Sequence, residues 1–261
     1  MNLSEAKHAL ISGGASGIGL GIADALSKRG IPVTIADINA EALAEVTAAR
    51  GNSVRGALLD TREREQWQKV KAEAEAAFGP VDILVNNAGI APDGLPISDG
   101  NSESFDRIIA INFGGIYNGV LTFAGDMRAR GRGHIVNTSS QAGLVTVITG
   151  VGAYSAAKFG VTGLTEALRT EMAEYGVGVT LLCPGAVKTN LAANTEKIGG
   201  NIRKYSGEMP DSGVTPDHVG EMVADGIEQN LPLVVTQGDM WPAIENRMLG
   251  IKAACDYRNE H

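Results

Sequence analysis

Short apolar runs alternate along the chain with longer segments in which apolar residues recur at helical spacing. The short runs are rich in Val, Ile and Leu and lack a strict apolar–polar alternation, which is typical of strands buried on both faces of a parallel sheet. The predicted strands are residues 8–12, 33–37, 54–59, 81–86, 134–139, 177–183 and 233–236. The predicted helices are residues 18–29, 40–50, 63–78, 104–129, 153–175 and 216–229. This alternation predicts an α/β fold with a doubly wound, seven-stranded parallel sheet and helices on both faces.

We predict a single domain because no linker, internal repeat or low-complexity run divides residues 1–261. Two segments depart from the strand–helix alternation. Residues 191–214 are polar and rich in glycine, as expected of a lid over a binding site or of a disordered loop. The tail, residues 237–261, has apolar residues at roughly helical spacing, and we expect it to pack on something, with ordinary cover of the core as the plain interpretation.

Composition limits the partners of the chain. Lys and Arg number 22 against 30 Asp and Glu, giving a net charge of −8 without a basic cluster, which argues against nucleic acid and anionic membranes. No apolar run is long enough to span a bilayer, and the first residues do not resemble a secretory signal. Cys183 and Cys255 cannot build a disulfide framework, and the four histidines do not cluster as metal ligands. We therefore expect a cytoplasmic protein without a metal site.

The first strand is followed by a glycine-rich turn and then a helix. The turn reads Ser12-Gly13-Gly14-Ala15-Ser16-Gly17-Ile18-Gly19. Glycine allows a tight turn and a close approach of the backbone to a ligand. The N-terminus of the helix presents free N–H groups and the positive end of its dipole, which suits a pyrophosphate. A plain strand–turn–helix corner is the alternative interpretation, so the motif alone indicates a dinucleotide site only modestly.

Polar residues at the ends of the next strands add to this interpretation. Asp37 ends the second strand. A carboxylate at this position binds the adenosine ribose of NAD and repels the 2′-phosphate of NADP. The alternative interpretation is that Asp37 caps the helix that begins near Ala40. Asp60, followed by Thr61, binds the adenine amino group or caps the next helix. The sequence Asn86-Asn87-Ala88-Gly89 ends the fourth strand, where small residues let the backbone approach a cofactor.

A second group of residues has the composition of a proton-transfer site. Tyr154 and Lys158 are four residues apart in a predicted helix, so their side chains project from one face. Ser140 lies just beyond the fifth strand, and the glycines between it and Tyr154 allow the chain to fold back. Asn112 lies on an apolar helix stripe, where a polar side chain needs a hydrogen-bond partner in the core or a function.

Together these motifs resemble the short-chain dehydrogenase/reductase family from His8 to about Thr189. The glycine turn is similar to the family's Thr-Gly-x-x-x-Gly-x-Gly loop with Ser in place of Thr, and residues 86–89 match its Asn-Asn-Ala-Gly motif. Residues 184–189, Pro-Gly-Ala-Val-Lys-Thr, match the segment that contacts nicotinamide. The resemblance implies a Rossmann-type fold and a catalytic tetrad of Asn112, Ser140, Tyr154 and Lys158. It also implies that NAD is bound by Gly13, Ser16, Gly17, Ile18, Gly19, Asp37, Asp60, Thr61, Asn87, Ala88, Gly89, Tyr154, Lys158, Pro184, Gly185, Val187 and Thr189.

The resemblance assigns each member of the tetrad a role. Tyr154 exchanges a proton with the substrate hydroxyl, and Lys158, together with the positive nicotinamide ring, lowers the pKa of the phenol and holds the nicotinamide ribose. Ser140 orients the substrate oxygen, and Asn112 binds a water that relays protons from Lys158. Ser139 competes with Ser140 for the serine role, but the family pattern Ser-x-x-Gly favours Ser140.

Two features depart from the family pattern. The spacing from Ser140 to Tyr154 is one residue longer than is commonest, and the family's frequent Gly-Gly near the C-terminus is missing. The tail is similar to that of a branch that oxidises aryl and other bulky alcohols.

We expect an NAD-dependent homodimer or homotetramer that interconverts a secondary alcohol and a ketone, with Gln141 and Val145 lining the substrate pocket. The alternative is a dinucleotide-binding sensor or interaction module without turnover.

Overall fold

The computed structural model describes residues 1–200, 202 and 213–257. Its centre is a seven-stranded sheet in the order β3-β2-β1-β4-β5-β6-β7 with all neighbouring pairs parallel. The strands are β1 (Ala9–Ser12), β2 (Val33–Asp37), β3 (Val54–Leu58), β4 (Ile83–Asn86), β5 (Gly133–Thr138), β6 (Val177–Cys183) and β7 (Leu233–Val235). The strand order reverses at β1, which lies between β2 and β4. The predicted doubly wound sheet is confirmed.

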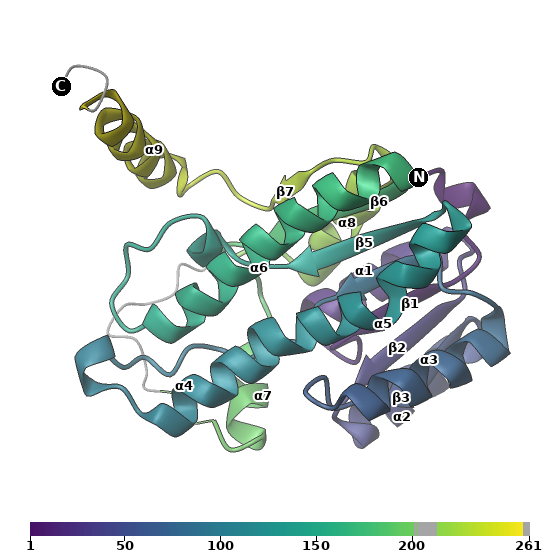
Figure 1. The fold of residues 1–261 in the computed structure, drawn as a ribbon. Helices are drawn as coiled ribbons and strands as arrows, with labels where there is room; N and C mark the ends of the chain where they lie inside the picture. The colour runs from purple at the N-terminus through teal and green to yellow at the C-terminus, as the bar shows by residue number, and fades with distance from the viewer. Residues whose placement is uncertain (201, 203–212, 258–261) are drawn as a thin grey trace.

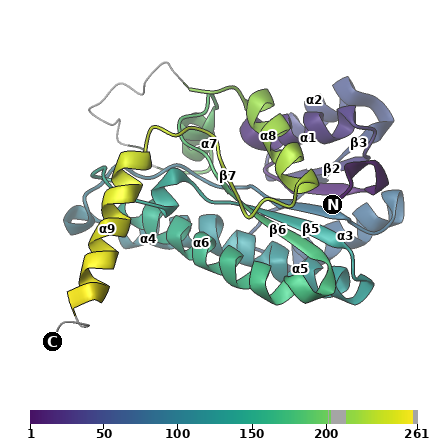
Figure 2. The same ribbon diagram turned by 90° about the horizontal axis from the view of Figure 1, so that it is seen from above.

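Helices cover both faces of the sheet (Figures 1 and 2). One layer contains α1 (Gly17–Lys28), α2 (Ala40–Arg50) and α8 (Pro216–Glu228). The other contains α3 (Arg64–Phe78), α4 (Ser102–Ile109), α5 (Gly115–Arg130) and α6 (Gly152–Met172). Each layer shares a buried apolar cluster with one face of the sheet, represented by Ile22 and Val219 on one side and Trp67 and Phe123 on the other. The strands are therefore apolar on both faces because both faces are covered.

The predicted helix 104–129 is interrupted. A π-helical turn, Ala110–Gly114, separates α4 from α5 and holds the buried Asn112. Within the described residues, the continuous stretch Ser102–Arg130 is long and apolar enough to cross a membrane, yet 61% of its most apolar window is buried inside the protein. Packing against the sheet accounts for this apolar character, as expected for a core helix.

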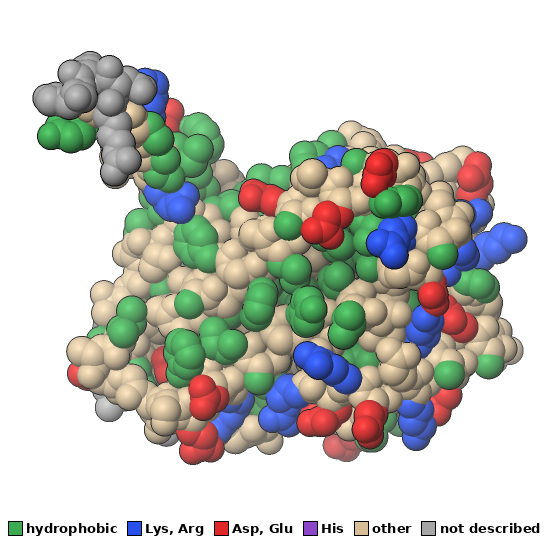
Figure 3. Space-filling view, in the orientation of Figure 1, with side chains coloured by type: hydrophobic (Ala, Val, Ile, Leu, Met, Phe, Trp, Pro, Cys, Tyr) green, Lys and Arg blue, Asp and Glu red, His purple; other side chains and the backbone are tan. Residues whose placement is uncertain are grey.

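Each of the two irregular segments contains a helix. The region 191–214 begins with a helix, α7 (Leu191–Lys197), and its residues 201 and 203–212 lie outside the described part of the chain. The tail forms α9 (Trp241–Tyr257), which has no buried residue and projects from the body of the molecule (Figures 1 and 3). The tail is therefore not ordinary cover of the core, because helical spacing of apolar residues predicts a helix and not its neighbours.

Candidate active site

The glycine turn lies against the end of β4. Gly13 and Gly17 have φ angles of +65° and +52°, which favour glycine. A Cβ at Gly13 would lie 2.9 Å from Ala88 Cα, so the two backbones touch. The side chain of Asn87 donates to the carbonyl oxygens of Ser12 (3.2 Å) and Gly13 (3.3 Å) and holds the turn in place.

The N-terminus of α1 has the features that a phosphate site needs. Ser16 precedes the helix, and its side chain makes no capping hydrogen bond to the first turn. The first N–H groups of α1, from Gly17 onward, therefore lack a cap from the Ser16 side chain, as at helix N-termini that bind phosphate. A Cβ at Gly17 would lie 3.1 Å from Thr189 Cγ2, so the 184–189 segment passes beside the same turn. These residues fit the pyrophosphate of a dinucleotide.

The two acidic residues of the predicted adenosine end occupy different environments. Asp37 accepts hydrogen bonds from the N–H groups of Ala15 (3.2 Å) and Asn39 (3.1 Å), which places its carboxylate beside the glycine turn. The side chain of Asn39, and not that of Asp37, caps α2. The alternative interpretation of Asp37 as a helix cap is therefore wrong.

Asp60 is paired with Arg62, whose guanidinium holds the pKa of that carboxyl below its usual range. It does not cap α3, which begins four residues later, after Glu63. Thr61 is buried, and its carbonyl accepts hydrogen bonds from the side chains of Trp67 (3.0 Å) and Asn118 (3.0 Å).

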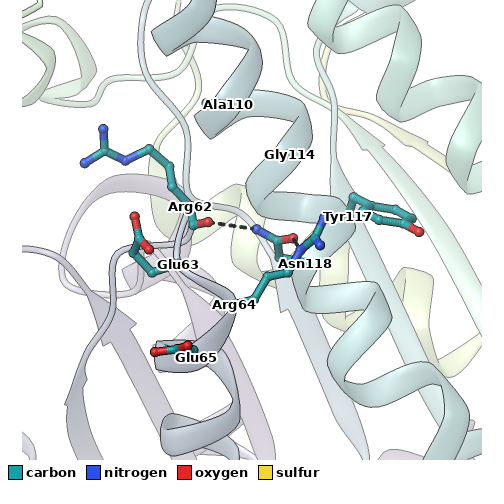
Figure 4. A pocket seen from close by; sticks show the side chains of 8 residues that line it. All are labelled: Arg62, Glu63, Arg64, Glu65, Ala110, Gly114, Tyr117 and Asn118. Atoms are coloured by element: carbon teal, nitrogen blue, oxygen red, sulfur yellow. Dashed lines mark hydrogen bonds between the residues drawn. The ribbon is translucent and has the colours of Figure 1, made fainter.

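A hollow of about 470 Å³ lies beside these residues, between the start of α3 and the α4–α5 stretch (Figure 4). Its lining includes Arg62, Glu63, Arg64, Tyr117 and Asn118. Arg64 reaches across the hollow and donates to Asn118 Oδ1 (2.9 Å). The hollow shares no residue with the predicted tetrad.

The four residues of the predicted tetrad converge at the carboxyl edge of the sheet. Lys158 Nζ lies 5.5 Å from the centroid of the Tyr154 ring and donates to the carbonyl of Thr138 (2.9 Å) at the end of β5. The Ser140 hydroxyl lies near enough to the Tyr154 phenol to lower its pKa. Gly89 lies close to both Asn112 and Lys158. A Cβ on this glycine would lie 2.8 Å from Asn112 Oδ1 and 3.6 Å from Lys158 Nζ, so the Asn112 amide and the Lys158 ammonium lie beside the same glycine.

Asn112 is held by the backbone of Ile90. Its Oδ1 accepts from the Ile90 N–H (2.8 Å), and its Nδ2 donates to the Ile90 carbonyl (3.1 Å). The π-helical turn around Asn112 opens the backbone ladder where this side chain meets the segment after β4, and such turns are frequent at functional sites. The buried amide thus has hydrogen-bond partners in the core and at the same time lies beside Lys158.

The two adjacent serines have separate environments. Ser139 is buried, and its hydroxyl donates to the Lys158 carbonyl (2.8 Å), so it anchors α6 to the end of β5. Ser140 is only half-buried; its hydroxyl oxygen accepts from the Ala142 N–H (3.1 Å), and the hydroxyl acts to lower the pKa of Tyr154. The geometry therefore favours Ser140 as the serine of the site.

Burial shifts the pKa values of Tyr154 and Lys158 in opposite directions. It raises the pKa of the Tyr154 phenol, and the hydrogen bond from Ser140 opposes this shift. It lowers the pKa of Lys158 to about 8. The sequence argument expected Lys158 and the nicotinamide ring to lower the pKa of Tyr154. Among the protein groups alone, desolvation has the largest effect on the phenol, so its pKa is raised.

Three contacts at this edge were not expected from the sequence. Asn194 of α7 donates to the Ser16 hydroxyl (3.1 Å), and the Thr195 hydroxyl accepts from the Ala91 N–H (3.0 Å), so α7 bridges the glycine turn and the segment after β4. Gln141, expected to line the substrate pocket, is instead buried against the segment that follows β7. No local spacing signals such contacts, because the partners are far apart along the chain.

A family model described as short chain dehydrogenase matches residues 7–198. The chain belongs to the short-chain dehydrogenase family. It is 32% identical to the C alpha-dehydrogenase of Sphingobium sp. over 259 residues, covering 93% of this chain and 84% of that protein. This family membership makes the protein an oxidoreductase with a nicotinamide-binding fold.

Two solved structures with the same fold hold different coenzymes. A short-chain dehydrogenase/reductase from Burkholderia phymatum in complex with NAD superposes with a TM-score of 0.88 at 27% identity, covering 97% of each chain. A variant of the actinorhodin polyketide ketoreductase with NADPH superposes with a TM-score of 0.78 at 32% identity, covering 91% of this chain and 98% of that one. Proteins of this fold thus accommodate either nicotinamide coenzyme.

Proposed function

We propose that this protein is an NAD-dependent oxidoreductase that interconverts a secondary alcohol and a ketone. The observation that carries the proposal is the convergence of Tyr154, Lys158 and Ser140 next to the glycine turn. A phenol within hydrogen-bond reach of a hydroxyl, and beside a buried ammonium, is suited to move one proton to or from a substrate oxygen.

The bound nicotinamide supplies or accepts the hydride, and the residues of the chain manage the proton and the orientation. The Tyr154 hydroxyl gives a proton to the oxygen of a ketone, or removes it from an alcohol. Ser140 donates a hydrogen bond to the same oxygen and holds it near the phenol. Positive charge on Lys158 favours the phenolate form of Tyr154, and Asn112 lies beside that ammonium, in position to bind a relay water.

The choice of NAD rests on Asp37. Its carboxylate lies beside Ala15, at the mouth of the glycine turn, where it repels a 2′-phosphate and accepts from ribose hydroxyls. Gly13, Ser16, Gly17, Ile18 and Gly19 would hold the pyrophosphate. The remaining cofactor contacts stay predictions: Asp60, Thr61, Asn87, Ala88 and Gly89 on the adenosine and ribose side, and Pro184, Gly185, Val187 and Thr189 on the nicotinamide side.

A bulky, uncharged substrate agrees with the rim of the site. Residues 144–151, just before Tyr154, carry no charge, and Val147 and Ile148 expose their side chains there. Ile97 is also exposed and packs against Gly152 at the start of α6. The similarity to a C alpha-dehydrogenase supports a dehydrogenase reaction at this site.

The assembly and location also remain proposals. Phe105, Tyr117 and Leu121 expose apolar side chains on α4 and α5, and we propose that this face joins copies of the chain in a homodimer or homotetramer. Light scattering on the purified protein measures this directly. A cytoplasmic location is kept as a prediction from the sequence.

Two variants test the function. Tyr154→Phe should reduce NADH formation from secondary alcohols by at least about 10²-fold while NADH binding is nearly retained, because only the transferable proton is removed. Asp37→Ala should raise the use of NADP relative to NAD. Retained turnover in the first variant, or an unchanged coenzyme preference in the second, would refute the assigned role. Tight NADH binding without turnover of graded alkyl and aryl alcohols would favour a sensor.

A further inference from the structure

The peptide group between Pro184 and Gly185 lies next to Ser140 and is held from both sides. Its carbonyl accepts from the Gln141 N–H (3.0 Å) and from the Ser140 hydroxyl (3.5 Å). Its N–H donates to Thr236 Oγ1 (3.0 Å) and Gln237 Oε1 (3.1 Å). A peptide group is planar, so holding the N–H also determines where the carbonyl points.

The side-chain amide of Gln237 binds this backbone at two points. Its Oε1 accepts from the Gly185 N–H, and its Nε2 donates to the Ala186 carbonyl. The Thr236 hydroxyl donates to the same Oε1. The Gln237 side chain therefore pairs with one backbone N–H and one backbone carbonyl just beyond the end of β6, as the backbone of a neighbouring strand would.

Gln141 completes the arrangement from the other side. Its side chain is only 6% exposed, and its Nε2 donates to the Gln237 carbonyl (2.7 Å) and to Asp239 Oδ1 (3.2 Å). A Cβ at Gly185 would lie 2.6 Å from Gln237 Oε1 and 2.9 Å from Gln141 Oε1. Only glycine leaves room for both amides, so the requirement for Gly185 arises from these glutamines as well as from any ligand.

We propose that Gln237, supported by Gln141, is a positioning residue for Ser140. With the Gly185 N–H held by Gln237, the Pro184 carbonyl faces the Ser140 hydroxyl, at a distance long enough for a substrate oxygen to take its proton instead. Without Gln237 the Gly185 N–H keeps only its bond to Thr236, and the Ala186 carbonyl loses the Gln237 donor. The peptide group is then held less firmly, the acceptor of the Gln141 N–H is less fixed, and the loop that carries Ser140 shifts. This inference rests on the proposed function of Ser140.

A double-mutant cycle tests the coupling. Gln237→Ala should lower kcat for alcohol oxidation by roughly 10- to 100-fold without a comparable loss of NADH affinity, because misplaced catalytic groups cost rate. In a Ser140→Ala background the same substitution should have little further effect, since the group that it positions is gone. Gln237→Glu retains the acceptor for Gly185 and loses the donor to Ala186, so a smaller loss is expected. Gln229→Ala, an exposed glutamine at the end of α8, is the matched control.

Hydrogen–deuterium exchange provides a readout that does not depend on turnover. Gln237→Ala, unlike Gln229→Ala, should speed exchange in peptides covering both 183–187 and 139–145. Equal losses of kcat with and without Ser140, an unchanged kcat, or unchanged exchange around Ser140 would overturn the proposal. If the unaltered enzyme turns over no alcohol or ketone, the proposed function fails, whereas the exchange experiment still decides whether Gln237 holds the Ser140 loop.

Discussion

Helices α6 and α9 are both long and both carry apolar residues at intervals, yet they lie in opposite environments. α6 packs against β5 and β6 and buries Lys158, Val161, Leu168 and other residues along its length. α9 spans 17 residues and buries none, although Leu249 and other apolar side chains lie along it. Arg247 of α9 lies over the Phe159 ring of α6, 5.1 Å from its centroid.

The difference shows that a helical pattern of apolar residues predicts a helix but not whether that helix is buried. A helix of this length is marginal in water by itself, so its contribution depends on what it packs against. In α6 the sheet excludes water around Lys158, and this desolvation changes the chemistry of the lysine. In α9 the same residue type, Lys252, stays exposed and pairs with Asp256 one turn away. Matched substitutions in the two helices test this contrast.

The largest expected effect is on activity. Lys158→Met should lower kcat/KM for alcohol oxidation by roughly 10²- to 10⁴-fold, because it removes the charge beside the phenol while keeping the length of the side chain. Lys252→Met in α9 should leave kcat/KM unchanged. Steady-state NADH formation measures both, and equal effects of the two substitutions would contradict the assigned role of Lys158.

The next effect is on stability. Leu168→Ala removes a side chain that is 5% exposed and should lower the free energy of unfolding by about 2–5 kcal/mol. Leu249→Ala removes one that is 59% exposed and should change it by less than about 0.5 kcal/mol. Urea denaturation gives both values. A large loss in the second variant would show that α9 is covered in solution.

A smaller effect should appear in the dependence of stability on pH. The pKa of Lys158 is about 8 in the folded protein and about 10.4 when unfolded, so the unfolded state binds more protons between these values. The free energy of unfolding should therefore rise with pH across this window relative to Lys158→Met, by at most about 1.4 kcal/mol per pH unit. Urea midpoints of both proteins at pH 8 and pH 10 measure the difference. Parallel curves would mean that the lysine is not desolvated.

The smallest effect is expected from removing α9 altogether. A chain that ends at Met240 keeps Gln237 and Asp239, and none of the removed residues that the structure describes, 241–257, is buried. Its free energy of unfolding should change by less than about 1 kcal/mol. A thermal midpoint that falls on truncation and depends on protein concentration would instead identify a second copy as the partner of α9.

Several details of the site depended on contacts between distant parts of the chain. Local spacing predicted a helix cap near residues 37–40, but only the coordinates show that Asn39 provides it and leaves Asp37 beside the glycine turn. Gln141 was expected in the substrate pocket, yet its partners, Gln237 and Asp239, lie almost 100 residues further along. Long-range pairs of this kind leave no periodic signal in a single sequence.

The residue pattern by itself predicted the seven-stranded α/β fold and the strand ends that carry the candidate site, and the family resemblance of its motifs pointed to Asn112, Ser140, Tyr154 and Lys158. These follow from apolar runs and short motifs, whose physical cause is local or repeats along the chain. Tertiary structure alone decided which helix is buried, which way the proton affinities of Tyr154 and Lys158 shift, and what holds the loop at Ser140. Burial and desolvation arise only when distant segments exclude water together, so they cannot be read from neighbours in sequence.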